Sequence, residues 1–176
     1  MTVTTGTVLP ELVIDVTPTF VISTAIATRD FQDVHHDRDK ALARGGKDIF
    51  INILTTTGLV QRYVTDWAGP DALVRKVDIR LGVPCYAGDT LAISGRVIQA
   101  GEGQHSGQDC VVEIVGRCGL GEHVTGTVRV GLPESGGGRG AGAGAERGRA
   151  RSAGAGTTER GGGKSRARGR GKQSRR

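Results

Sequence analysis

The chain has 176 residues and a formal net charge of +6, which alone would suggest one domain with a nucleic-acid partner. Residues 1–135, however, carry 12 Lys and Arg against 16 Asp and Glu, whereas residues 136–176 carry 12 against 2. The composition excludes a membrane-spanning protein, because no apolar run approaches the roughly 20 residues that cross a bilayer. The N-terminus also lacks the basic start and apolar stretch of a secretory signal, so we expect a cytoplasmic protein.

The first half of the chain predicts one strand and one long helix. A strand-like region around residues 12–16 leads through a mixed apolar stretch into a charged segment. Residues 49–66 are typical of a helix, because apolar residues recur four positions apart, as Ile49 and Ile53 do. Gly69, followed by Pro, ends this helix. The helix begins apolar on nearly all sides, so we expect it to be enclosed by other elements.

The second half of the chain predicts strands. Apolar residues alternate with polar or small ones at residues 77–81, 91–96 and 124–130, and residues 110–118 are a further candidate. Breaks of hairpin length separate these segments, which favours an antiparallel sheet over βαβ units. The order of elements predicts an α+β fold in which one curved antiparallel sheet wraps around a long central helix, the hot-dog architecture. Its free sheet edge predicts association with a second copy or a homologous hot-dog chain.

The C-terminal part of the chain differs from the rest. We expect a single hot-dog domain over residues 1–133 and a disordered, basic, Gly/Arg-rich tail over residues 134–176. Residues 136–176 hold 14 of the 30 glycines and no Val, Ile, Leu, Met, Phe, Tyr or Trp, so nothing offsets the entropy cost of ordering them. Such a tail could bind polyanions weakly and non-specifically, or it could be an inert extension.

The isolated cysteines and histidines give no sign of a metal site. Cys85, Cys110 and Cys118 form no Cys-x-x-Cys pair, and their odd number argues against a disulfide framework or a structural zinc site. We expect reduced cysteines in or near the core and no bound metal. His105 and His123 lie in predicted loops, where we expect surface side chains.

The densest group of titratable side chains is the segment DFQDVHHD at residues 30–37. One interpretation is a solvated acidic loop whose Asp residues cap the next helix. A second is a metal site with the four ligands His35, His36, Asp37 and Asp39. A third is an acid/base pair in which Asp30 and His35 both point into a cleft. The residues alone leave these three interpretations open.

This segment resembles the hydratase motif of MaoC-like hot-dog enzymes, D-x-N-P-x-H-x-D followed by an Ala. The matching residues are Asp30, His35, Asp37 and Ala41. The sequence IFINILTTTGL is similar to the family's central helix. A P-x-x-x-G-D turn of the family is matched by Pro84, Gly88 and Asp89. The resemblance covers roughly residues 8–131.

The resemblance implies an enoyl-CoA hydratase, a hydro-lyase that adds water across the double bond of a trans-2-enoyl-CoA. Asp30 and His35 would activate the water and transfer the proton, and a backbone N–H at the helix start would bind the enolate oxygen. No cofactor is implied, because coenzyme A enters as part of the acyl-CoA substrate. Gln32 replaces the motif's Asn and Asn52 replaces a Gly of the family, so both are candidate substrate or oxyanion contacts.

Within the family, the motif and helix sequences are most similar to the small subunit of heteromeric enoyl-CoA hydratases of actinobacterial steroid side-chain degradation. This resemblance implies a bulky steroid substrate and a homologous hot-dog partner subunit, with a homodimer as the alternative. Two other functions stay open. One is a hot-dog acyl-CoA thioesterase, although residues 49–65 lack the carboxylate that such enzymes generally need. The other is a non-catalytic acyl-CoA-binding or nucleic-acid-associated subunit.

Overall fold

The computed structural model describes residues 3–103 and 107–133. Five strands form one antiparallel sheet in the order β1-β3-β4-β5-β2, which places β1 and β2 at its edges. The strands are β1 (Val8–Asp15), β2 (Leu73–Leu81), β3 (Thr90–Glu102), β4 (Gln108–Cys118) and β5 (Gly121–Leu132). The predicted tail and His105 lie outside the described residues.

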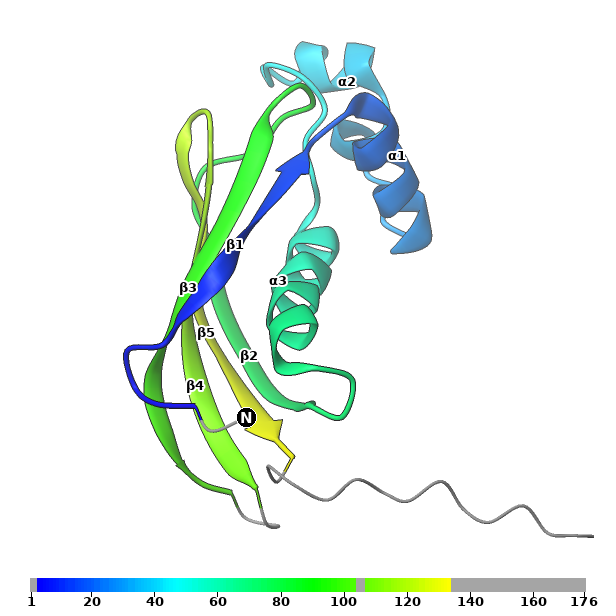
Figure 1. Ribbon diagram of the computed structural model, residues 1–176. Helices are drawn as coiled ribbons and strands as arrows, with labels where there is room; N and C mark the ends of the chain where they lie inside the picture. Colours follow the sequence, from blue (N-terminus) through cyan, green and yellow to red (C-terminus); the bar gives the residue numbers. More distant parts are fainter. Residues whose placement is uncertain (1–2, 104–106, 134–176) are drawn as a thin grey trace, which may run out of the picture. The chain divides into compact units, whose positions relative to one another are not determined.

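The helices occupy two places relative to this sheet. They are α1 (Pro18–Ala27), the 3-10 turn η1 (Asp33–His35), α2 (Arg38–Ala43) and α3 (Ile53–Ala68). Helix α3 packs on the concave face of the sheet, while α1 and α2 lie beyond the end of β1 (Figure 1). The predicted α+β hot-dog fold is therefore confirmed. Of the helices in the described part of the chain, none has the length and apolar character that a bilayer crossing requires.

The core lies between α3 and the sheet. On β4, every second residue from Cys110 to Gly116 is buried, as the alternating sequence predicts for a strand with one face on a core. Ile114 of β4 and Val60 of α3 are both fully buried. Burial of a side chain of this size stabilises the fold by about 1.5–3 kcal/mol.

The central helix begins at Ile53 instead of at Ile49, so the predicted start is wrong. Residues 49–51 are extended and pair with residues 85–87 through two backbone hydrogen bonds of 3.1 and 2.9 Å. Asn52 then caps the helix, since its side-chain oxygen accepts a backbone N–H of the first turn. The apolar run that resembled a helix start is thus a short strand-like segment followed by a cap.

One face of α3 is open in this chain. The side chains of Ile53 and Leu54 are 53% and 51% exposed, and the backbone at Gly58 is exposed one turn further along. The helix is therefore covered on its sheet side only. The expectation of an enclosed helix is not met by the single chain, and another molecule would be needed to cover this face.

Replacing Gly95 with Ala should loosen the contact between α3 and the sheet. A Cβ at Gly95 would lie 2.8 Å from the carbonyl oxygen of Glu113 and 3.0 Å from the ring of Tyr63. Because a backbone oxygen cannot move cheaply, we expect a loss of about 1–3 kcal/mol in the free energy of unfolding, measurable by urea denaturation. Gly101→Ala is the matched control. Gly101 lies on the same strand, β3, and a Cβ there would meet no atom within 4 Å. Equal stabilities of the two variants would contradict this packing.

Candidate active site

Asp30 and His35 face each other beside the start of α3. The Nε2 atom of His35 lies 3.6 Å from Oδ2 of Asp30, and their side chains are 8% and 17% exposed. The two residues come together because Arg29 adopts a positive φ of 57° at the end of α1, after which the chain turns into η1. The separation is too long for a good direct hydrogen bond, so a small polar molecule could be held by both groups.

The orientation of His35 fixes which ring nitrogen carries a hydrogen. Its Nδ1 lies 2.7 Å from the carbonyl oxygen of Phe50, which can only accept a hydrogen bond. In the neutral ring, Nδ1 therefore carries the hydrogen and Nε2 presents a lone pair toward Asp30. The ring of Phe50 also packs edge-on against the imidazole, with centroids 4.8 Å apart. The ring of His35 is thus held with Nε2 facing Asp30.

Asn52 holds the carboxylate of Asp30. Its Nδ2 donates to Oδ2 of Asp30 at 3.1 Å and to the hydroxyl oxygen of Thr28 at 2.8 Å. The Thr28 hydroxyl in turn donates to the carbonyl of Thr24 at 2.7 Å. Because the Oδ1 atom of Asn52 accepts the N–H of Thr55, the whole amide is engaged. In this structure, Asn52 has no free hydrogen for an oxyanion, and its evident role is to position Asp30.

The second candidate contact, Gln32, meets Asp30 through its backbone. The N–H of Gln32 donates to Oδ1 of Asp30 at 3.3 Å, whereas the Gln32 side chain is exposed. This turn helps to orient the carboxylate. A substrate contact by the Gln32 side chain stays a prediction.

The other two acidic residues of residues 30–37, Asp33 and Asp37, make contacts that stabilise the local fold. Asp37 caps α2 by accepting the N–H of Lys40 at 3.1 Å. That hydrogen bond, together with the Lys40 charge, lowers the pKa of Asp37. Asp33 pairs with Arg44 at 2.9 Å. The helix-capping interpretation thus applies to Asp37. Asp30 and His35 face each other as the third interpretation requires, and their acid/base role stays a prediction.

The prediction that His123 lies in a surface loop is wrong. His123 is in β5 and only 2% exposed. Its Nδ1 lies 2.8 Å from the carbonyl of Val83, and its Nε2 lies 2.9 Å from the hydroxyl of Thr56 in α3. Since the carbonyl can only accept, Nδ1 carries the hydrogen and the hydroxyl donates to Nε2. Glycines close to His123 in the sequence favour a turn, so the sequence pattern does not indicate that this residue lies in a strand.

Burial of His123 predicts a loss of stability in acid. Burial lowers the pKa of His123 from its ordinary 6.5, so the unfolded chain binds this proton more readily than the folded chain. Stability should be unaffected well above pH 6.5 and should decline as the pH falls below it. Urea unfolding of wild type and His123→Gln between pH 8 and pH 5 tests this, and the variant should lose part of the decline. An identical pH dependence would contradict it.

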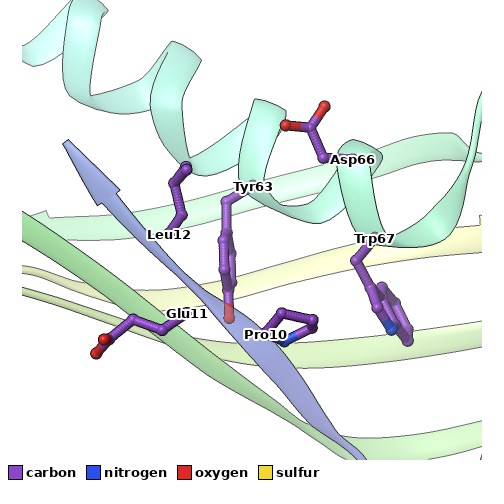
Figure 2. A pocket seen from close by; sticks show the side chains of 6 residues that line it. All are labelled: Pro10, Glu11, Leu12, Tyr63, Asp66 and Trp67. Atoms are coloured by element: carbon purple, nitrogen blue, oxygen red, sulfur yellow. The ribbon is translucent and has the colours of Figure 1, made fainter.

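A cavity of about 200 Å³ lies between β1 and the second half of α3. Figure 2 shows its lining side chains, which are Pro10, Glu11, Leu12, Tyr63, Asp66 and Trp67. Burial and the Glu11 charge raise the pKa of Tyr63. None of the lining residues belongs to the Asp30/His35 pair, so this cavity is separate from the candidate active site.

Comparison with known proteins shows the relationships of the chain. No family model matches it. It is 60% identical over 130 residues to the 3-oxo-4,17-pregnadiene-20-carboxyl-CoA hydratase beta subunit of Mycobacterium tuberculosis, covering 74% of this chain and 97% of that protein. A chain in the crystal structure of the ChsH1-ChsH2 complex from the same organism is 61% identical, with a TM-score of 0.70 and coverage of 75% and 99%.

A more distant neighbour agrees in fold. The (R)-hydratase of A. caviae involved in PHA biosynthesis has a TM-score of 0.66 at 16% identity, with coverage of 74% of this chain and 98% of that one. At this identity, the likeness shows the fold alone. The extensive match to the beta subunit carries the assignment: the chain belongs to the MaoC-like hot-dog hydratase family.

Proposed function

We propose that this chain is the small, catalytic subunit of an enoyl-CoA hydratase that acts on a bulky, unsaturated steroid acyl-CoA. The observation that carries the proposal is the facing pair of Asp30 and His35, 3.6 Å apart, with each side chain fixed by its own hydrogen bonds. The substrate class is supported by the name of the Mycobacterium tuberculosis relative that shares 60% identity, a pregnadiene-carboxyl-CoA hydratase subunit. No cofactor takes part in the proposed reaction, and coenzyme A belongs to the substrate.

In the proposed reaction, a water molecule contacts both Oδ2 of Asp30 and Nε2 of His35 from one side, since their separation of 3.6 Å leaves no room between them. The water attacks the β-carbon of the enoyl thioester while one of the two groups takes its proton. The group that took the proton returns it to the α-carbon as the enolate collapses, so the elements of water add across the double bond and the pair is restored. Both groups are needed because one water must be oriented and deprotonated in the same step.

The start of α3 offers donors for the enolate oxygen. The first N–H groups of a helix have no partner within the helix. Asn52 caps the N–H of Thr55, and among the described residues this leaves the N–H groups of Ile53 and Leu54 as the candidate oxyanion donors. The positive end of the helix dipole favours negative charge at the same place.

A partner subunit would complete this site. Phe31, next to Asp30, is 64% exposed, and Ile53 and Leu54, next to Asn52, are each about half exposed. The single chain leaves these apolar side chains uncovered, and each is within two residues of Asp30 or Asn52 in the sequence. The matched structure of the Mycobacterium tuberculosis relative is a complex of two proteins. We therefore include a homologous hot-dog partner in the proposal, and a cytoplasmic location consistent with the free cysteines of the described residues.

The proposal is tested by assaying hydration of an unsaturated steroid acyl-CoA with the purified chain, alone and after co-expression with a homologous hot-dog chain from the same organism. We expect a stable two-protein complex and turnover by that complex. Full activity of the chain alone as a homodimer would overturn the need for a partner. Absence of hydration by both preparations would overturn the function.

A further inference from the structure

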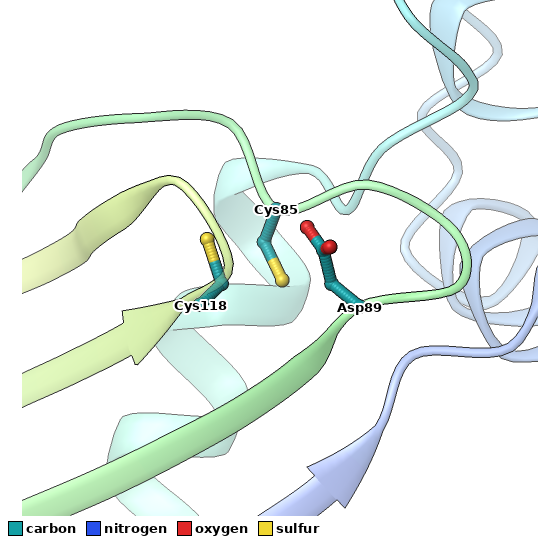
Figure 3. A group of neighbouring side chains, drawn as sticks. All are labelled: Cys85, Asp89 and Cys118. Atoms are coloured by element: carbon teal, nitrogen blue, oxygen red, sulfur yellow. The ribbon is translucent and has the colours of Figure 1, made fainter.

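Two cysteine thiols and one carboxylate from two parts of the sequence meet at one point in the fold. Cys85 and Asp89 come from the connection between β2 and β3, and Cys118 comes from the end of β4 (Figure 3). One potential ligand atom from each residue lies within 4.8 Å of the other two. Cys85 is fully buried, whereas Asp89 and Cys118 are half-buried, so solvent can reach the group from one side.

The carboxylate of Asp89 has one oxygen available for a further ligand. Asp89 takes part in none of the ion pairs formed by the described residues. One of its oxygens accepts the N–H of Tyr86 at 3.0 Å, which leaves the other oxygen available.

We propose that Cys85, Asp89 and Cys118 bind a thiophilic divalent cation of the Zn²⁺ class. Two sulfur donors and one carboxylate oxygen are a ligand set that Zn²⁺ accepts, with a water molecule in the fourth position. Each thiol releases its proton to solvent as its sulfur–metal bond forms, and no electron is transferred. The two thiolates and the carboxylate then share the positive ion, which offsets the cost of holding their negative charges close together.

The bound cation would fasten together the segments that support the active site. The carbonyl of Cys85 accepts the N–H of Ile51 at 3.1 Å, and the preceding residue, Phe50, provides the carbonyl that orients His35. A cation would also join the β2–β3 connection to the end of β4. The binding proposal itself does not rest on the proposed hydratase function.

The test uses the full chain, purified under reducing conditions and stripped of metal, then titrated with Co²⁺ as a spectroscopic probe and with Zn²⁺. We expect one ion per chain, a thiolate-to-cobalt charge-transfer band that Zn²⁺ abolishes, and release of about two protons per Zn²⁺ at a pH where both thiols are protonated in the free chain. Thermal unfolding should shift to higher temperature with bound Zn²⁺, because the ion binds the folded state.

Two variants identify the ligands without removing the fully buried thiol. Loss of an outer-shell partner already weakens metal binding about 10–100-fold, so Cys118→Ser and Asp89→Asn should each weaken Zn²⁺ binding by at least about tenfold. Asp89→Asn keeps an oxygen acceptor for the N–H of Tyr86. Cys110→Ser, which alters a buried cysteine outside the cluster, is the control and should bind Zn²⁺ as wild type does.

Two results would overturn the proposal. One is the absence of a charge-transfer band while both thiols remain free by thiol titration. The other is Zn²⁺ affinity that is unchanged in Cys118→Ser and Asp89→Asn, which would place the ion elsewhere, for example on surface histidines. Neither result depends on whether the chain hydrates an acyl-CoA, so failure of this site and failure of the proposed function are distinguishable.

Discussion

Asp30→Asn is expected to lower kcat for hydration by about 10²–10⁴-fold, the range typical of a lost general acid or base. The substitution keeps the shape of the side chain and an oxygen that can accept from Asn52, so the local fold should persist. It removes the charge that orients and deprotonates the water opposite His35, 3.6 Å away. The measurement is the steady-state loss of enoyl-thioester absorbance, with circular dichroism and thermal unfolding to confirm the fold.

Matched variants separate this effect from a change in surface charge. Asp39→Asn removes an exposed carboxylate of the same segment and should leave the rate unchanged. His35→Gln should lose turnover as Asp30→Asn does, whereas His36→Gln should retain it, because only His35 faces Asp30. Retention of wild-type kcat by Asp30→Asn or His35→Gln would contradict the assigned pair.

Asn52 both caps the start of α3 and donates a hydrogen bond to Asp30. Asn52→Asp is expected to keep the cap and to remove the donor. Asp is a favoured N-cap residue, so the helix start should persist, but the second carboxylate lies beside Asp30 at a position only 2% exposed and should lower the free energy of unfolding at neutral pH. The variant loses the donor to Asp30, a hydrogen bond to a charged group worth about 1.5–3 kcal/mol. Since each 1.4 kcal/mol is about tenfold in rate, kcat should fall by about 10–100-fold.

Asn52→Ala provides the comparison, because it removes the cap as well as the donor. We expect the same loss of kcat and, in addition, a loss of about 1 kcal/mol in the free energy of unfolding. A wild-type kcat in Asn52→Asp would show that the hydrogen bond to Asp30 does not matter for turnover. A shift in KM alone would instead place Asn52 in substrate binding.

The parts of the fold that could be predicted are those with an uninterrupted periodicity. The alternation along β4 from Cys110 to Gly116 matches its burial at each position. The start of α3 was misplaced because Ile49 and Ile51 lie two residues apart with Ile53 following, a spacing that suits a strand and a helix alike. Only the pairing of residues 49–51 with residues 85–87 decides between them, and that contact is not local in the sequence.

The site was predictable only in part. Asp30 and His35 are five positions apart and match a motif, so their convergence follows from a single turn. The role of Asn52 could not be found in this way, since its amide meets Thr28 and Asp30 across the intervening η1 and α2. The cluster of Cys85 and Cys118 was missed for a similar reason, because their spacing matches no metal-binding motif. Tertiary contacts therefore decide the positioning residues, while local sequence indicates the reacting ones.

The most direct test of the central claim is the mass of the product formed from an unsaturated steroid acyl-CoA by the full chain with its hot-dog partner. Our account predicts an intact acyl-CoA heavier by one water, formed by wild type and absent with Asp30→Asn. Release of free coenzyme A thiol without a hydrated thioester would contradict the account and indicate a thioesterase.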